Sequence, residues 1–389
     1  MLLLDVTHTS HTRAHTGIQR VCRSLAAELT AAGPVTPVCF DPYQHAWRPL
    51  HRAELATLAN RSGEAGSRGA RWSLSARLLG QARRYTGRRP SLPPADLLLC
   101  PELFSARTAA RLPELFAAVR GPRVAVFHDA IGLKLPELTP PATVARLPAY
   151  LRELTAFDGI AAVSEDSAAS LRDYWAWLGW ANPPPVTAIP LGLDPIPHLA
   201  ETPRPPGGPR ILCVATLEGR KNHVALLDAA EALWREGLVF ELELIGLARA
   251  ETAAPALARL AALRAAGRPV QHHGSVSDSA LHAAYARCDF TVYPSLHEGF
   301  GLPVLESLQH GKPCVCAPAG ALAESARGGG CRIVPAPDVR HLTDALRDLL
   351  RSPEQLAALA AAARARTYRP WCDYARDLVA WARGLPRRG

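Results

Sequence analysis

The chain contains 389 residues, of which 48% are hydrophobic, and its formal net charge is +9. This length exceeds that of a typical single domain, so we expect two domains that each bury a core of their own. No apolar run approaches the roughly 18 residues of a membrane span, and Asp5 ends the apolar opening of the chain, so we expect no signal peptide and a cytoplasmic protein. The nine cysteines include no Cys-x-x-Cys pair, and their odd number argues against a disulfide framework.

Short β-rich runs alternate with longer helical segments along the chain. This alternation is typical of α/β proteins, in which helices cover both faces of parallel sheets and ligands bind at the carboxyl ends of the strands. A segment rich in proline and glycine, 194–210, separates two halves and is the predicted linker. We expect strands at 2–6, 35–40, 97–100, 124–127, 159–163 and 186–190 in the first half, and at 211–215, 240–245, 270–273, 290–293, 313–317 and 332–334 in the second.

Three histidines, His8, His11 and His15, lie in the predicted loop between the first strand and the first helix. Their spacing invites a zinc site, but no matching carboxylate or cysteine lies nearby in the sequence, so we expect no metal there. Cys314 and Cys316 are also expected to bind no metal. Because alternate residues of a strand share a face, we place both in a buried strand.

Positive charge is concentrated between residues 60 and 90, where eight arginines and one glutamate give a balance of +7 out of the +9 of the whole chain. Trp72, Leu78 and Leu79 lie among these arginines, as in a cationic amphipathic helix that rests on an anionic membrane surface. A flexible, solvated insertion accounts for the same composition equally well. Nucleic-acid binding is disfavoured, because neither interleaved aromatic residues nor a recognisable module accompanies the charge.

The segment 298–306 reads Glu-Gly-Phe-Gly-Leu-Pro-Val-Leu-Glu. Proline is favoured at the first position of a helix, so Pro303 predicts a helix over about 301–310. Glu298 would then precede the helix, and Glu306 would lie in its first turn. Glycine lets the backbone approach a ligand, and a helix start offers N–H groups to an anion. The segment predicts a site for a phosphate and for hydroxyl groups, although alone it would also fit an ordinary surface helix.

With its surroundings, this segment resembles the Glu-x7-Glu signature of retaining glycosyltransferases, specifically family 4 with the GT-B fold. The run Gly-Arg-Lys-Asn at 219–222 is similar to the family's phosphate-binding Arg-Lys pair. Further matches are Thr16-Gly17-Ile18, His128-Asp129, Val163-Ser164-Glu165, Pro190-Leu191-Gly192-Leu193-Asp194, Gly274, Tyr293-Pro294-Ser295 and Gly311-Lys312-Pro313-Cys314-Val315. The resemblance implies two Rossmann-like domains facing across a cleft: an acceptor domain, 1–195, and a donor domain, 209–369. A C-terminal helix, 370–389, would cross back onto the first.

The resemblance also assigns the site. The catalytic residues would be Glu298, His128, Arg220 and Lys221. The donor-binding residues would be Gly17, Arg220, Lys221, Gly274, Glu298, Phe300, Gly301, Leu302 and Glu306.

Each of these residues has an implied role. Arg220, Lys221 and the helix start at 300–302 would neutralise the leaving diphosphate. Glu298 would bind hydroxyls of the donor sugar, and Glu306 both ribose hydroxyls. A merely solvated basic pair is the alternative for 220–221, but cations at a helix start oppose the helix dipole unless an anion joins them. The chain also has only three lysines, which makes Lys221 more informative.

The implied activity is transfer of a hexose from GDP-mannose or a UDP-hexose to a hydroxyl of a glycan or lipid-linked acceptor. We expect neither metal nor cofactor, because no Asp-x-Asp signature occurs in a fitting context. A lipid-linked acceptor would suit a peripheral position at the inner face of the cell membrane. We expect Lys221 and Glu306 to face solvent in the cleft. The alternatives are another GT-B enzyme, such as a phosphorylase or nucleotide-sugar epimerase, and a non-catalytic subunit that binds nucleotide sugars.

Overall fold

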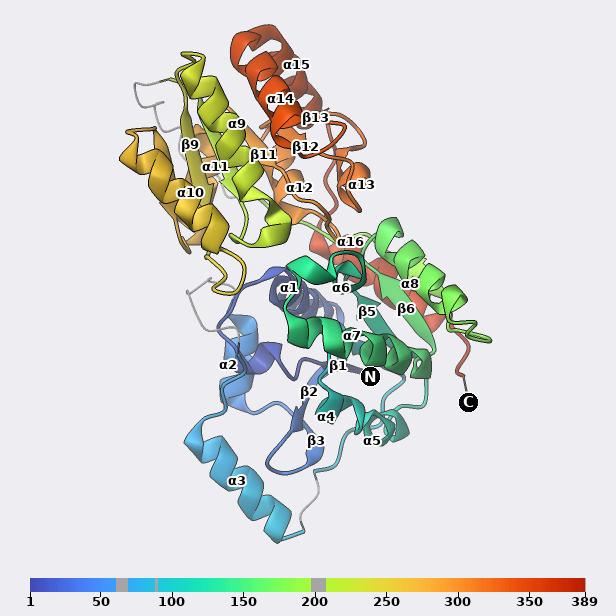
Figure 1. Ribbon diagram of the computed structural model, residues 1–389. Helices are drawn as coiled ribbons and strands as arrows, with labels where there is room; N and C mark the ends of the chain where they lie inside the picture. The colour runs from blue at the N-terminus through green and yellow to red at the C-terminus, as the bar shows by residue number, and fades with distance from the viewer. Residues whose placement is uncertain (61–68, 88–89, 197–207, 389) are drawn as a thin grey trace. The chain divides into compact units, whose positions relative to one another are not determined.

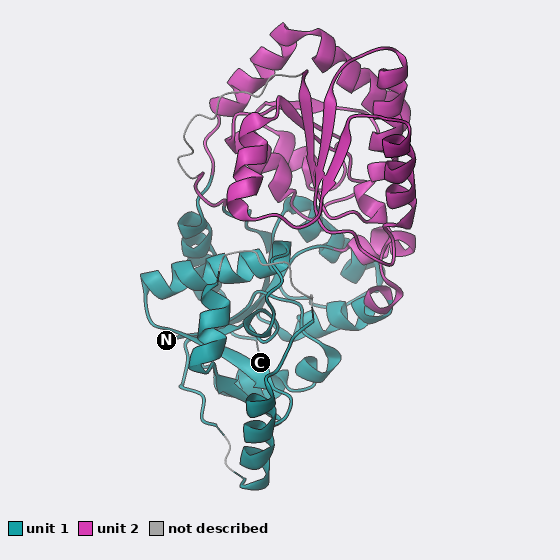
Figure 2. Ribbon diagram, turned by 90° about the vertical axis from the view of Figure 1, so that its left-hand side faces the viewer, with its two compact units in different colours: residues 1–129, 145–192, 369–389 teal, residues 130–144, 193–368 magenta. Residues whose placement is uncertain are grey.

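The computed structural model describes residues 1–60, 69–87, 90–196 and 208–388 (Figure 1). They divide into two compact units, each built around one sheet (Figure 2). The centre of the predicted linker, 197–207, lies outside the described residues. The first unit comprises residues 1–129, 145–192 and 369–389, and the second comprises residues 130–144 and 193–368.

The first unit contains a 7-stranded sheet in the order β3-β2-β1-β4-β5-β6-β7. All neighbouring strands are parallel except β3, which forms an antiparallel pair with β2. The central strands are buried along their whole length, which explains their nearly continuous apolar sequences. The strands are β1 (Leu2–Asp5), β2 (Val35–Asp41), β3 (Ala46–Pro49), β4 (Leu97–Cys100), β5 (Arg123–Phe127), β6 (Gly159–Ala162) and β7 (Val186–Ala188).

Helices from both ends of the chain complete the first unit. The last helix, α16 (Trp371–Arg383), packs against α1 (Gly17–Ala32) and buries Tyr374 and Leu378. Gly192 lets the segment after β7 approach the start of α16, because an added Cβ would lie 2.5 Å from the Cα of Trp371. The other helices are α2 (Arg52–Ala59), α3 (Leu74–Tyr85), α4 (Ala106–Ala109), α5 (Leu112–Ala117), α8 (Glu165–Trp177) and α7 (Pro141–Glu153), whose first residues are grouped with the second unit.

The second unit contains a 6-stranded parallel sheet in the order β10-β9-β8-β11-β12-β13. In this order the connections reverse direction between β8 and β11, and such a switch point is where open α/β sheets bind ligands. The strands are β8 (Arg210–Val214), β9 (Glu241–Ile245), β10 (Val270–His273), β11 (Phe290–Tyr293), β12 (Cys314–Cys316) and β13 (Cys331–Ile333).

Helices cover this second sheet on both sides (Figure 2). A large apolar cluster joins the strands to α9 and α14 and includes Trp234, which stacks on Phe240 with ring centroids 5.0 Å apart. The helices are α6 (Ile131–Lys134), α9 (His223–Arg235), α10 (Ala254–Ala265), α11 (Asp278–Arg287), α12 (Leu302–Gln309), α13 (Leu322–Ala326), α14 (Val339–Arg351) and α15 (Pro353–Arg364).

In both units, an aspartate that precedes a strand is hydrogen-bonded to the backbone of the residue that begins the neighbouring strand. In the first, the Asp158 carboxylate accepts a hydrogen bond of 2.7 Å from the backbone N–H of Arg123, and the Asp158 N–H donates to the Arg123 carbonyl at 2.8 Å. In the second, Asp289 and Arg210 make the same two bonds at 2.7 and 2.9 Å. Each aspartate thus ties the start of one strand to its neighbour.

The predicted α/β class is confirmed, and all predicted strands are present. Cys314 and Cys316 lie in the buried strand β12, as predicted. The antiparallel strand β3 was not predicted, because it is a short edge strand that contains Arg48 and Pro49. Among the described residues, no helix combines the length and the apolar character that crossing a bilayer requires.

Candidate donor site

The predicted donor residues other than Gly17 gather at the carboxyl edge of the second sheet, beside the switch point. Arg220 and Lys221 follow β8 in a short 3-10 turn (Gly219–Lys221), and Glu298 follows the neighbouring strand β11. The prediction that the two cations open a helix was wrong. Asn222 interrupts the backbone with a left-handed φ of 56°, and α9 begins only at His223.

Arg220, Lys221 and Glu298 form one ion cluster. The guanidinium of Arg220 lies 3.0 Å from Oε2 of Glu298, and the ammonium of Lys221 contacts Oε1. The Lys221 ammonium also donates to the Tyr293 hydroxyl at 2.5 Å. The expectation that Lys221 faces solvent was wrong, because Lys221 and Glu298 are only 7% and 6% exposed. The charges are held together inside the protein.

A second carboxylate extends this cluster. Glu218 lies 2.8 Å from the guanidinium of Arg220 and 3.0 Å from that of Arg249. Glu251 also lies 3.6 Å from the guanidinium of Arg249, so the three cations of this cluster face three carboxylates. Neither Glu218 nor Arg249 was predicted to belong to the site, although Glu218 directly precedes the Gly-Arg-Lys run in the sequence.

Burial and the neighbouring charges fix the protonation of the cluster. Burial alone would raise the pKa of Glu298, but Lys221 and then Arg220 lower it to about 2. Burial lowers the pKa of Lys221, whereas its contact with Glu298 opposes that shift. Glu298 is thus ionised at neutral pH and holds both cations.

Helix α12 supplies the second part of the site. It runs from Leu302 to Gln309, close to the predicted bounds, and Gly301 precedes it with a φ of 91°. A side chain at 301 would be strained, and its Cβ would lie 2.8 Å from Cδ2 of Leu322. Among the described residues, the amides of 300–302 have no acceptor in the structure, so this helix start remains open to an anion.

Glu306 lies in the second turn of α12, and the prediction of the first turn was wrong. Its side chain is 8% exposed, so the expectation of a solvent-facing residue was also wrong. The Tyr285 hydroxyl donates to Oε2 of Glu306 at 3.2 Å. Tyr285 also stacks on His310, with ring centroids 4.9 Å apart and planes 13° apart. Tyr285 was missed because nothing in its local sequence links it to Glu306.

Gly274 follows β10, and its carbonyl accepts a 3.1 Å hydrogen bond from the N–H of Gly246. Gly274 is exposed and its surroundings are open, since an added Cβ would meet only Leu247, at 4.0 Å. The loop after β10 thus presents backbone groups at the same carboxyl edge as the ion cluster.

The remaining predicted residues belong to the first unit. His128 follows β5 and is 8% exposed, and its Nε2 lies 2.7 Å from the carbonyl oxygen of Pro101. This places the ring proton on Nε2, and burial lowers the pKa of His128, so the ring is neutral at physiological pH. Ser164 caps α8 by accepting a hydrogen bond of 3.1 Å from the N–H of Ser167. Gly17 opens α1 in open surroundings.

The first unit also buries a carboxyl pair at the carboxyl edge of its sheet, which the sequence did not predict. Burial, then the neighbouring Glu102, raises the pKa of Asp5 to about 7, and burial likewise raises that of Glu102 to about 7. Glu102 accepts hydrogen bonds from the N–H and hydroxyl of Thr9 at 3.0 and 2.6 Å and also contacts the N–H of His8. Glu102 therefore shapes the histidine-containing loop.

Of that loop, His11 joins a buried ion network. Its Nε2 lies 2.9 Å from Glu54, and its Nδ1 lies 2.8 Å from the Thr7 carbonyl oxygen. In the described ranges, His11, Cys39 and Glu54 are the one group of three potential metal ligands whose atoms lie within 4.8 Å of one another. Arg48 also donates to both oxygens of Glu54 at 2.7 Å. With both ring nitrogens facing oxygen atoms and a guanidinium on the carboxylate, this geometry suits an ion network better than a metal.

Trp72 also belongs to this network. Its ring stacks on His11 with centroids 3.6 Å apart. The prediction that Trp72 shares an amphipathic helix with Leu78 and Leu79 was wrong, because Trp72 precedes α3. Leu78 and Leu79 do lie on α3 and are 65% and 45% exposed.

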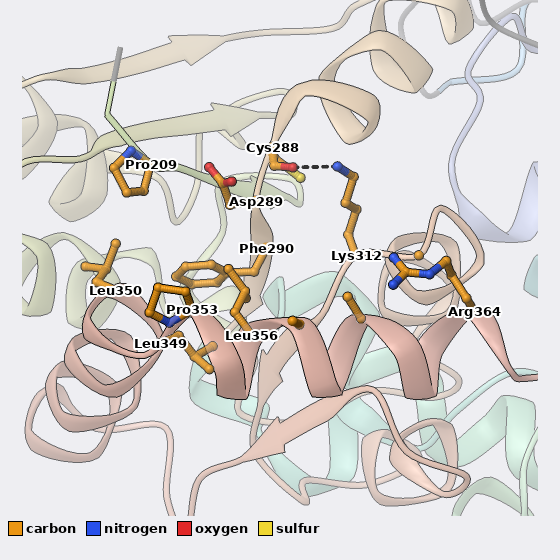
Figure 3. A pocket seen from close by; sticks show the side chains of 13 residues that line it. Pro209, Cys288, Asp289, Phe290, Lys312, Leu349, Leu350, Pro353, Leu356 and Arg364 are labelled. Carbon is orange, nitrogen blue, oxygen red and sulfur yellow. Dashed lines mark hydrogen bonds between the residues drawn. The ribbon is translucent and has the colours of Figure 1, made fainter. Parts of the chain in front are cut away.

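A cavity of about 510 Å³ lies at the opposite, amino edge of the second sheet (Figure 3). Phe290, Leu349 and Leu356 form part of its lining. The Lys312 ammonium donates hydrogen bonds to the carbonyls of Ala286 and Cys288, at 2.8 and 2.7 Å, and so caps the end of α11. The cavity is separate from the donor residues, which follow the other ends of the same strands.

Solved structures with the same fold identify the class. Sucrose-phosphate synthase from Thermosynechococcus elongatus superimposes with a TM-score of 0.69 over 98% of both chains, at 17% identity. HepE from Anabaena, in a complex with UDP and glucose, gives a TM-score of 0.67 over 99% of both chains, at 16% identity. The fold is that of the GT-B glycosyltransferases.

The sequence of the second unit also resembles known glycosyltransferases. Residues 198–366 match the model of the glycosyl transferases group 1. The chain is 28% identical over 343 residues to the serotype-specific mannosyltransferase WbdA of Escherichia coli. The aligned region covers 81% of this chain but only 38% of WbdA. The chain is also 31% identical over 223 residues to an MMP alpha-(1->4)-mannosyltransferase of Mycolicibacterium hassiacum, covering 56% of this chain and 52% of that one.

Proposed function

We propose that this chain is a retaining, metal-independent glycosyltransferase of family 4 that transfers mannose from GDP-mannose to a hydroxyl of a glycan or lipid-linked acceptor. The observation that carries this proposal is the buried cluster of Arg220, Lys221 and Glu298 beside the open start of α12. Mannose is preferred to the other hexoses because the relatives named above are mannosyltransferases. A UDP-hexose is the alternative donor.

In the proposed reaction, the bond between the anomeric carbon and the diphosphate oxygen breaks, and a bond from that carbon to the acceptor oxygen forms. The proton of the acceptor hydroxyl passes to the departing diphosphate. Negative charge grows on the departing diphosphate. Arg220, Lys221 and the amides at 300–302 would stabilise that charge. The diphosphate would take the place of Glu298 as the partner of the two cations, which frees the Glu298 carboxylate for sugar hydroxyls.

Two further residues complete the proposed site. Glu306 would accept both ribose hydroxyls, with Tyr285 holding its carboxylate in place. His128 would act in its neutral form beside the transferred sugar, since its Nε2 proton is directed to a carbonyl.

The first test combines nucleotide binding with turnover. Purified protein is mixed with GDP or UDP in a thermal-unfolding assay, and hydrolysis of GDP-mannose, UDP-glucose and UDP-N-acetylglucosamine is measured. We expect stabilisation by GDP and hydrolysis of GDP-mannose, and both should be lost in Arg220→Met. Arg347→Met is the matched control. Arg347 lies on α14, away from the site, and pairs with Glu236 at the end of α9. Stabilisation without turnover of any donor would indicate a non-catalytic binding subunit, and full activity of Arg220→Met would refute the assignment.

We also infer that α3 contacts an anionic membrane surface. Leu74 and Leu78 lie one helical turn apart and are 74% and 65% exposed, and Arg83 and Arg84 lie in the last turn. Exposed leucines beside arginines suit a surface of anionic lipid headgroups. The protein should sediment with vesicles of phosphatidylglycerol and not with vesicles of phosphatidylcholine. Equal sedimentation of the wild type and Leu78→Glu would contradict this inference.

A further inference from the structure

Two histidines from α11 and the end of α12 meet beside the proposed ribose carboxylate. His282 lies on α11, and His310 follows the last residue of α12. Nδ1 of His282 and Nε2 of His310 are 3.0 Å apart, and the ring centroids are 5.2 Å apart. Both side chains are partly exposed, so solvent can reach the pair. None of the roles proposed above uses either residue.

We propose that His282 and His310 form a two-nitrogen chelating site for a divalent transition-metal ion such as Zn²⁺, and that the bound ion weakens nucleotide binding through Tyr285 and Glu306. The second part rests on the proposed function, whereas the first does not.

The distance between the two nitrogens suits chelation. With Zn–N bonds of about 2.0–2.1 Å and a tetrahedral angle, two ligating nitrogens lie about 3.4 Å apart. The pair therefore needs to open by only about 0.4 Å to accept the ion. Both rings must also turn so that the two lone pairs converge on the ion. Water would fill the other coordination positions.

The tautomers of the two rings decide whether the pair can chelate an ion. In the present contact one inner nitrogen carries the proton and the other accepts it. When this proton moves to the outer nitrogen of its ring, both inner lone pairs are left for the ion. Two charged groups also act on His310: Glu306 favours a cation there and Lys312 opposes it. The Lys312 ammonium is held by two carbonyls.

A short chain of contacts links this pair to the nucleotide site. The Tyr285 ring stacks on His310 at 4.9 Å, and its hydroxyl donates to Glu306 at 3.2 Å. An ion that turns the His310 ring would disturb the stack and, through Tyr285, the carboxylate that the ribose needs. The ion's charge would also attract Glu306. Both effects lower the affinity for the nucleotide.

Metal binding is tested first, without a nucleotide. The full chain, freed of metal, is titrated with Zn²⁺ at pH 7.5 in a calorimeter. We expect binding in the wild type and at least a tenfold loss of affinity in both His282→Asn and His310→Asn. His341→Asn is the matched control, because His341 lies on α14 and pairs with Asp338 at the start of that helix. This variant should bind Zn²⁺ as the wild type does. Unchanged Zn²⁺ affinity in both site variants, with unfolding curves like that of the wild type, would overturn the site.

The coupling is tested by titrating the protein with GDP in the calorimeter, with and without saturating Zn²⁺. We expect several-fold weaker GDP binding with Zn²⁺ in the wild type and no difference in His282→Asn. Zn²⁺ binding at the pair with no change in GDP affinity would overturn the coupling and leave the metal site in place. Failure of the metal-free chain to bind GDP or UDP would overturn the proposed function and the coupling with it, whereas the zinc titration still decides the site.

Discussion

Replacing Glu298 by glutamine should destabilise the second unit markedly. Glutamine keeps the shape of the side chain and removes its charge, so Lys221 and Arg220 lose their shared partner. Removing one member of a buried ion pair typically costs about 3–5 kcal/mol, because the other charge stays buried without compensation. The variant therefore tests whether the cations are held by charge or merely packed.

The magnitude follows from the pKa of Glu298. Its ordinary value of 4.5 falls to about 2 in the folded protein. At about 1.36 kcal/mol per unit, this shift corresponds to about 3.4 kcal/mol at pH 7. Since the folded pKa is depressed, this contribution is complete well above pH 4.5 and is lost as the pH falls towards 2. At pH 3.5 only about 2 kcal/mol should remain.

The effect on the second unit is measured by urea unfolding, with hydrogen exchange in the β8 and β11 peptides as the probe of unfolding. The free energy of unfolding of Glu298→Gln should fall by about 3 kcal/mol at pH 7, and the difference from wild type should shrink at pH 3.5. The double variant with Lys221→Met should be less destabilised than the sum of the single variants, because it leaves one buried charge fewer. Equal stability of wild type and Glu298→Gln at pH 7 would refute the reasoning.

Three further predictions concern stability. Trp72→Ala should cost about 2 kcal/mol, since it removes the ring stacked on His11. Faster hydrogen exchange over 71–85 would reveal it, and unchanged exchange would contradict it. His223→Leu should become more stable relative to wild type by about 1.6 kcal/mol between pH 6.5 and 5 in urea unfolding, because burial lowers the folded pKa of His223 to about 3 and only the unfolded wild type gains a proton. A pH-independent difference would exclude this. Gly301→Ala should cost about 1–2 kcal/mol in thermal unfolding, since its φ is 91° and its Cβ would meet Leu322, and a neutral result would argue against strain.

The fold was largely predictable because most of its strands are short, almost wholly apolar runs in the sequence. Runs such as Leu97–Cys100 are buried on both faces, so nearly every residue in them is apolar. Strand β3 was not predicted because it contains Arg48, whose charge is compensated by Asp41 and Glu54 rather than by solvent. Such compensation depends on distant partners and leaves no local pattern.

The candidate site was predictable in its members and less so in its environment. The motifs at 219–222 and 298–306 identified residues that the fold brings together, although Lys221 and Glu298 are 77 positions apart. Their burial could not be read from the sequence, since charged residues between glycines usually face solvent. The contact between Trp72 and His11 was hidden for a similar reason, because it depends on how a loop and the segment before α3 fold against each other.

The seating of α16 on α1 has a consequence for biosynthesis. The chain leaves the ribosome from its amino end, so the apolar side of the first helix emerges long before the segment 371–383 that covers it. Throughout translation of the second sheet, α1 must wait for this neighbour. A nascent polypeptide that has been synthesised only to about residue 368 would therefore leave an apolar surface of the first unit uncovered. Proteases and chaperones of quality control would recognise that intermediate until α16 is made and packs against α1.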